Sequence, residues 1–75
     1  MEAYVLIGLR GESEQAVLEE LTSHVEVVEG HVLFGEWDLI IKLDVESTEA
    51  AGTFVMEHVR KLDEVKLTST LIVAK

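Results

Sequence analysis

The sequence predicts a single α+β domain in which one four-stranded antiparallel sheet carries two helices on one of its faces. Two observations predict this class. The apolar patterns follow the order strand, helix, strand, and this order occurs twice along the 75 residues. No proline, linker or low-complexity segment separates the two halves, so residues 1–75 are expected to form one domain. Two split βαβ units of this kind make a ferredoxin-like βαββαβ sandwich.

The first half contains the first strand, the first helix and the second strand. Residues 3–10 are nearly continuously apolar, which is typical of a strand buried on both faces. Ser13 is positioned to cap an amphipathic helix that spans residues 13–23. Residues 25–34 predict the second strand, in which Gly30 is expected to mark a bulge.

The second half repeats this order. Residues 37–44 predict the third strand, and Ser47 or Thr48 is positioned to cap the second helix. Residues 65–74 predict the last strand. The apolar stripe expected on the second helix consists of Ala51, Val55, Val59 and Leu62.

One face of the predicted sheet carries no helix, and alternation along the strands predicts which side chains lie there. The side chains expected to face the helices are Val5, Ile7, Leu9, Trp37, Leu39, Ile41, Leu43, Leu67, Leu71 and Val73. Those expected on the open face include Tyr4, Leu6, Asp38, Ile40, Lys42, Thr68, Thr70 and Ile72. The apolar members of this second group form a contiguous patch, which predicts a homodimer that associates through its open faces.

The turn at residues 35–38 carries the main candidate binding residues. Its sequence is Gly-Glu-Trp-Asp, and it leads directly into the third strand. Gly35 permits positive φ and a close backbone approach, and Asp38 is available to pair with an ammonium group. With the hydroxyls of Thr68 and Thr70, this set matches what a free amino acid requires. The alternative is a hairpin with a solvated Asp38 and threonines that simply suit a strand.

Charge and composition narrow the function classes. The net charge of −9 argues against nucleic-acid binding, which needs a basic patch. The absence of cysteine excludes disulfides, thiolate catalysis and cysteine zinc sites. No apolar stretch is long enough to span a bilayer and none resembles a signal peptide, so the protein is expected to be cytoplasmic. The six basic residues, scattered along the chain, are Arg10, Lys42, Arg60, Lys61, Lys66 and Lys75.

Neither an enzyme nor a cofactor site is expected. The three histidines, His24, His31 and His58, lack a metal-ligand spacing, and His58 beside the apolar stripe is expected to be packed and hydrogen-bonded. The glycines are spread singly, so no phosphate-binding loop is present. A small dimeric ferredoxin-like enzyme that uses Asp38 or Glu36 with a histidine remains an alternative.

The turn before the apolar third strand and the closing run Val-Lys-Leu-Thr-Ser-Thr-Leu-Ile-Val at 65–73 resemble the effector-binding domain of the Lrp/AsnC family of leucine- and asparagine-responsive regulators. In that family the domain is called RAM, for regulation of amino acid metabolism. The resemblance covers the whole chain. Because the chain begins directly at the first strand, it is similar to the stand-alone RAM proteins, which lack the DNA-binding helix-turn-helix.

This resemblance implies a sensor of amino acids or similar small metabolites that contributes to transcription regulation. Such domains dimerise through their sheets, and the dimers assemble into rings such as octamers with the effector between dimers. Gly35, Trp37 and Asp38 would form the loop of the pocket, and Thr68 and Thr70 the strand that meets it. Full-length Lrp/AsnC regulators are then expected partners, and direct nucleic-acid or membrane binding is not. An ACT-type regulatory domain and a ligand-free assembly module remain alternatives.

Overall fold

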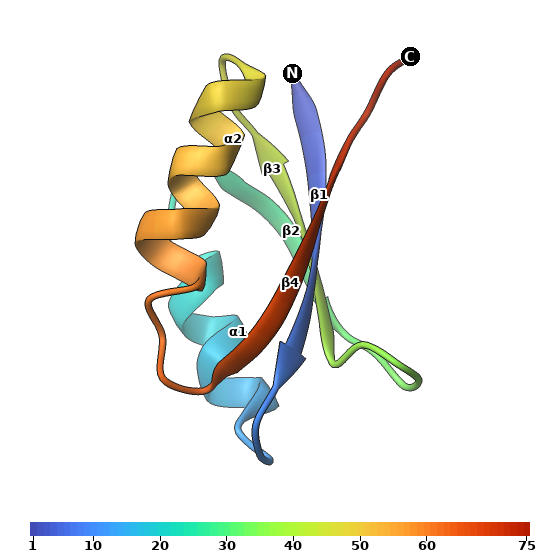
Figure 1. The fold of residues 1–75 in the computed structure, drawn as a ribbon, viewed down its shortest axis with the longest axis vertical. Coiled ribbons are helices and arrows are strands. Elements are labelled where there is room, and N and C mark those ends of the chain that lie inside the picture. The colour runs from blue at the N-terminus through green and yellow to red at the C-terminus, as the bar shows by residue number, and fades with distance from the viewer.

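The computed structural model describes all 75 residues and has one antiparallel sheet in the order β2-β3-β1-β4. Both helices lie on the same side of this sheet, and its other side is uncovered (Figure 1). The predicted ferredoxin-like fold is therefore confirmed. No helix is long and apolar enough to cross a membrane. The elements are β1 (Glu2–Leu9), α1 (Glu14–Thr22), β2 (Val27–Val32), β3 (Leu39–Asp44), α2 (Thr48–Phe54), η1 (Val55–Val59) and β4 (Val65–Ile72).

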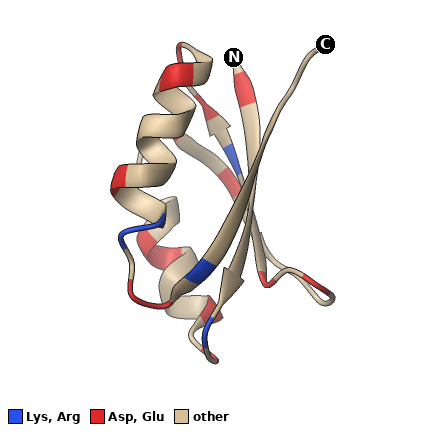
Figure 2. Ribbon diagram, viewed as in Figure 1, with Lys and Arg blue, Asp and Glu red and all other residues tan.

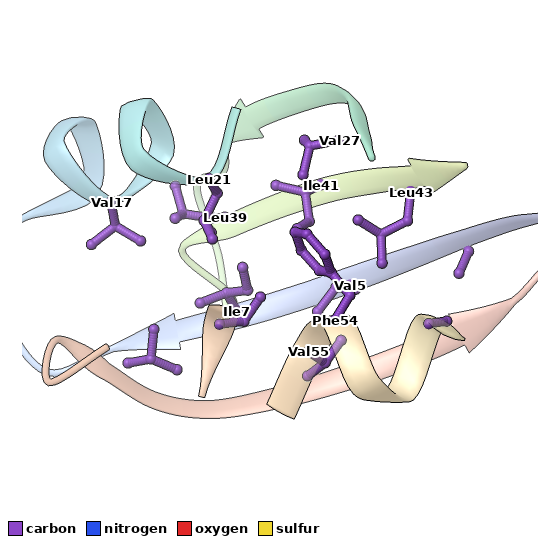
Figure 3. Packing of buried hydrophobic residues seen from close by; sticks show 14 of the residues in the cluster. Val5, Ile7, Val17, Leu21, Val27, Leu39, Ile41, Leu43, Phe54 and Val55 are labelled. Carbon is purple, nitrogen blue, oxygen red and sulfur yellow. The ribbon is translucent and has the colours of Figure 1, made fainter. Parts of the chain in front are cut away.

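The core lies between the sheet and the helices and consists of fifteen apolar side chains (Figure 3). Alternation predicted its central part correctly, because every second residue of β1 and β3 is buried there. Phe54 reaches into the core from α2. Burying one large aliphatic side chain contributes about 1.5–3 kcal/mol, so this cluster dominates the stability of so small a domain. The largest fully buried side chains are Val5, Ile7, Leu21, Leu39, Ile41, Leu43 and Val59.

The second helix begins as predicted and ends in a wider turn. Ser47 caps α2, since its Oγ accepts a hydrogen bond of 3.0 Å from the N–H of Ala50. The helix then continues as η1, a π-helical segment in which the N–H of Arg60 donates to the carbonyl of Val55 at 2.8 Å. Val55 and Val59, at the two ends of this segment, are both buried. At α1, Ser13 occupies the N-cap position without a side-chain hydrogen bond.

Gly30 has a different role from the one predicted. The irregularity in the β2–β3 pairing lies between Val27 and Glu29, so the bulge is not at Gly30. A Cβ at Gly30 would lie 2.8 Å from Cδ1 of Leu18 and 3.0 Å from Cγ2 of Thr22, both on α1. The glycine therefore permits the close approach of α1 to β2.

A bulge at the start of β4 overturns the predicted orientation of this strand. Gly8 of β1 pairs with Leu67, and the residue after it, Leu9, pairs with Val65. Lys66, between the two partners, has no partner in β1 and is therefore an extra residue in β4. Val65 is buried, and the extra residue reverses the alternation beyond it.

After the bulge, the side chains of β4 lie opposite to expectation. Residues that pair directly in an antiparallel sheet project from the same face, and the partners of Thr68, Thr70 and Ile72 are buried residues of β1. These three side chains are therefore on the helix side. Leu67 and Leu71 are on the open face, where about half of each residue is exposed.

Candidate functional site

The loop between β2 and β3 projects beyond the sheet, as the green loop in Figure 1 shows. The N–H of Leu33 donates to the carbonyl of Asp38 at 2.8 Å and closes the base of the loop. Gly35 has φ of +147°, a conformation that side chains other than glycine rarely adopt. The neighbouring Phe34 is fully exposed, and Trp37 is half-buried at the base. The predicted third strand begins later than expected, at Leu39.

Asp38 connects this loop to the end of β1. Its Oδ2 accepts a hydrogen bond of 2.7 Å from the N–H of Leu9, and its own N–H donates to the carbonyl of Ile7 at 2.9 Å. The other carboxylate oxygen, Oδ1, has no hydrogen-bond partner within the chain. One carboxylate oxygen of Asp38 thus holds the side chain in place, and the other is free to accept a hydrogen bond. The sequence did not reveal this contact, because it joins residues far apart in the chain.

The predicted site residues do not come together on one face of the chain. Asp38 precedes the buried Leu39, so alternation puts Asp38 on the open side. Thr68 pairs with Ile7 and Thr70 pairs with Val5, which puts both threonines on the helix side. The prediction that Asp38, Thr68 and Thr70 share the open face was therefore wrong, and the bulge at the start of β4 is the reason.

The open face carries an apolar patch, as predicted, but with different members. Leu67 and Leu71 take the place predicted for Ile72. Sequence reasoning missed both leucines, because uninterrupted alternation along the last strand put them in the core. We call the following set the open-face patch: Tyr4, Leu6, Ile40, Leu67 and Leu71.

Charged residues of the open face lie beside this patch in two ion pairs. Lys42 Nζ lies 3.4 Å from Glu2 Oε2, and the pKa of Lys42 is raised by the hydrogen bond with that carboxylate. His31 Nε2 lies 2.8 Å from Glu29 Oε2, and this hydrogen bond lowers the pKa of Glu29. The ammonium of Lys42 also lies 5.8 Å from the ring centre of Tyr4. Both pairs are exposed and contribute little to stability.

A cavity of about 400 Å³ lies between α2 and the end of β3 and is strongly acidic. Beside it, His58 packs its ring against Phe54 and His24, with ring centres 5.0 and 4.5 Å apart. His58 is therefore packed as predicted, but it makes no hydrogen bond. No three His, Cys, Asp or Glu side chains are arranged to hold a metal ion. The acidic residues that line the cavity are Glu26, Asp44, Glu46 and Glu57.

Comparison with known proteins gives the family. The model of the Lrp/AsnC ligand binding domain matches residues 2–75. An HTH-type transcriptional regulator of Pyrococcus furiosus is 32% identical over 73 residues, which are 93% of this chain and 49% of the regulator. The chain thus spans about half the length of the curated relatives that it matches.

Solved structures agree with this match. The crystal structure of FFRP-DM1 is 35% identical with a TM-score of 0.90, and the match covers 96% of both chains. AsnC of E. coli is 27% identical with a TM-score of 0.91, over 99% of this chain and 50% of AsnC. On this evidence of sequence and fold, the chain belongs to the Lrp/AsnC family, and its residues form the ligand-binding domain of that family.

Proposed function

We propose that this domain is a regulatory module, and not an enzyme, that binds an amino acid between its assembled subunits. The single observation that carries the proposal is the state of Asp38. One of its oxygens is held by the N–H of Leu9, and the other is unpaired beside an exposed loop. A fixed carboxylate with a free acceptor is suited to an ammonium group, because hydrogen bonds between charged groups are the stronger ones.

The backbone of the same loop supplies donors for a carboxylate. The N–H groups of residues 34–37 donate no hydrogen bond within the chain. The positive φ of Gly35 leaves the backbone open to close approach, and nothing lies within 4 Å of the position where its Cβ would be. Carboxylate acceptors and amide donors within one short loop match the two ends of a free amino acid.

Thr68 and Thr70 enter this proposal from a neighbouring subunit. Within one chain they lie on the opposite side of the sheet from Asp38. We therefore assign the loop with Gly35, Trp37 and Asp38 to one subunit and the two threonines to another. A site divided in this way would be complete only in the assembled protein, and an effector would then stabilise the assembly by mass action.

The open-face patch is the surface that we assign to the first step of assembly, a homodimer. A contiguous apolar surface on a small domain is typical of an interface. The fully exposed Phe34 of the β2–β3 loop is assigned to contacts between dimers, in an assembly such as an octamer. Full-length Lrp/AsnC regulators, which would carry the same interfaces, are the proposed heterologous partners.

A thermal-shift screen against the twenty amino acids tests the ligand. A ligand at 100 times its dissociation constant adds about 2.7 kcal/mol per site, which is a shift of many degrees for a domain of this size. We expect at least one amino acid to raise the melting temperature of the wild type and to lose this effect in Asp38→Asn. Glu36→Gln is the matched control, since it removes the same charge two residues away, and it should retain the shift.

A ligand-free assembly module is the second candidate. The hydrogen bond from the N–H of Leu9 to Asp38 favours this second candidate, because it gives the carboxylate a structural role even without a ligand. A screen without any shift, on a protein that sediments as a higher oligomer, would support this candidate and contradict amino-acid binding. A shift that persists in Asp38→Asn would contradict the assigned site.

A further inference from the structure

A second cavity of about 400 Å³ lies at the end of the molecule where β1 ends, η1 ends and β4 begins. It is distinct from the β2–β3 loop and from the acidic cavity. Figure 2 shows blue segments just after β1, at the end of η1 and at the start of β4. Arg10 is far in sequence from the other two cations, whereas Arg60 and Lys66 flank the single loop that joins η1 to β4. The residues that line the cavity are Arg10, Arg60, Val65, Lys66, Leu67 and Thr68.

The cavity concentrates positive charge in a strongly acidic protein. It holds three of the six basic residues of a chain whose net charge is −9, and no carboxylate lines it. None of the three forms an ion pair, although the chain contains fifteen acidic residues. Asp63 and Glu64, in the adjacent loop, line a different cavity. The positive charge is therefore available to an anion from outside the chain.

The three cations reach the cavity from different positions in the fold, and only the side chain of Arg10 is held by a hydrogen bond. Arg10 is anchored twice to the loop before β4, since its N–H donates to the carbonyl of Glu64 at 2.9 Å and its Nε donates to the carbonyl of Asp63 at 3.1 Å. Arg60 follows η1 directly, at the end of the π-helical segment. Lys66 is the bulge residue of β4, and bulges commonly redirect a side chain.

We propose that this cavity binds a small molecule through a compact dianionic group, a phosphate or a pair of carboxylates. Guanidinium groups bind such oxyanions with paired N–H donors, and the hydroxyl of Thr68 adds a neutral donor. The volume lies within the range of small-molecule sites, about 300–1,000 Å³. A nucleic-acid backbone fits less well, because it would extend over the acidic surface outside the cavity.

The proposal does not depend on amino-acid binding at the β2–β3 loop. Asp38 does not line this cavity, and none of its three cations belongs to the loop. Asp38→Asn should therefore leave anion binding unchanged. Thr68 is the one binding residue that both proposals use, and neither test substitutes it. Each proposal is therefore decided by its own variants, Asp38→Asn for the amino-acid site and Arg60→Gln or Lys66→Gln for this cavity.

The test is a titration of the full chain with inorganic phosphate, followed by backbone amide NMR shifts, at an ionic strength held constant with sodium chloride. Succinate replaces phosphate in a parallel titration, to distinguish a phosphate site from a dicarboxylate site. We expect saturable shifts at residues 10, 60 and 65–68 with at least one of the two anions. Chloride alone should not produce them.

Variants then distinguish a specific binding site from non-specific electrostatic attraction. Arg60→Gln and Lys66→Gln should each weaken binding at least about tenfold, since each removes a charged hydrogen-bond donor to the anion. Arg10→Gln should also weaken binding about tenfold. Because the Arg10 side chain also contacts the loop before β4, the amide spectrum of this variant is used to check that it is folded. Lys61→Gln is the matched control, because Lys61 lies next to Arg60 but outside the cavity.

Three results would overturn the proposal. The first is a set of shifts that chloride reproduces at equal ionic strength. The second is an equal loss of binding in Lys61→Gln and Arg60→Gln. The third is binding of a short DNA duplex that is tighter than binding of phosphate and is lost in Arg60→Gln, which would assign the cavity to nucleic acid.

Discussion

At the scale of single residues, Asp38 combines a structural and a proposed binding role. Its hydrogen bond with Leu9 secures the loop to β1, and its second oxygen is the acceptor that we assign to an ammonium group. Two substitutions separate these roles. Asparagine keeps an oxygen acceptor and removes the charge, whereas alanine removes both.

We therefore predict that Asp38→Ala lowers the free energy of unfolding by about 1–3 kcal/mol, the cost of leaving the N–H of Leu9 without its charged partner. Asp38→Asn should lower it by less than half as much. Chemical denaturation of both variants, followed by circular dichroism, measures the difference. Equal losses would show that the charge, and not the hydrogen bond, stabilises the loop.

Glu29 supplies a prediction for pH. Its hydrogen bond with His31 lowers the pKa of Glu29 below the ordinary 4.5, so the contact stabilises the fold above that pH. The contribution is lost as the pH falls through the lowered pKa. An NMR titration of the carboxyl group should show the pKa of Glu29 rising toward 4.5 in His31→Ala. An unchanged pKa would mean that the two side chains do not interact in solution.

At the scale of elements, the sequence predicted the order, type and approximate extent of all four strands and both helices, because strand and helix periods differ clearly. It did not predict the irregularities. The bulge in β4 follows from the pairing of Gly8 with Leu67 and Leu9 with Val65, which no local pattern indicates. The π-helical turn at residues 55–59 likewise leaves the apolar stripe almost unchanged.

These irregularities explain why the candidate site was only partly predicted. The turn that contains Gly35 and Asp38 was predicted from its local turn residues, and its role in ligand binding stays a prediction. The orientation of Thr68 and Thr70 was not predicted correctly, since one extra residue reverses every side chain that follows it. The cationic cavity was missed as well, because only the fold brings Arg10 to the segment that contains Arg60 and Lys66.

Two glycines provide a matched prediction for the helices. Gly30→Ala places a Cβ 2.8 Å from Leu18 and should destabilise the domain by about 1–3 kcal/mol through overpacking between α1 and β2. Gly52→Ala lies in α2 with nothing within 4 Å and should stabilise it by about 0.8–1.0 kcal/mol through helix propensity.

Thermal unfolding distinguishes the two variants, since 1 kcal/mol corresponds to about 4–8 °C for a domain of this size. The melting temperature should fall in Gly30→Ala and rise in Gly52→Ala. An unchanged or raised melting temperature in Gly30→Ala would show that Leu18 and Thr22 move aside without cost, and that the glycine is not required for the approach of α1.

At the scale of the whole molecule, the reversed orientation of β4 decides which substitution breaks the proposed dimer. Leu71 belongs to the open-face patch and Ile72 does not. Leu71 is 49% exposed in the single chain, and a twofold interface uses each patch residue twice. Its loss from both subunits therefore corresponds to about 1.5–3 kcal/mol, or about 10- to 150-fold in the dissociation constant.

We therefore predict that Leu71→Asp sediments as a monomer at concentrations at which the wild type is a dimer or larger. Ile72→Asp, the adjacent control, should lower the melting temperature and leave the assembly intact once folded. Dissociation by Ile72→Asp and not by Leu71→Asp would restore the orientation predicted from uninterrupted alternation along the strand, and it would contradict the bulge in β4.

The central claim is that assembled subunits share an amino-acid site, and sedimentation equilibrium with and without amino acids tests it most directly. The measurement uses tens of micromolar protein and a mixture of the twenty amino acids at about millimolar concentration. Without ligand, we predict a mass of at least twice the 8.4 kDa of one chain. Addition of the amino acids should shift the protein toward a larger assembly. A protein that sediments at 8.4 kDa under both conditions would contradict the account.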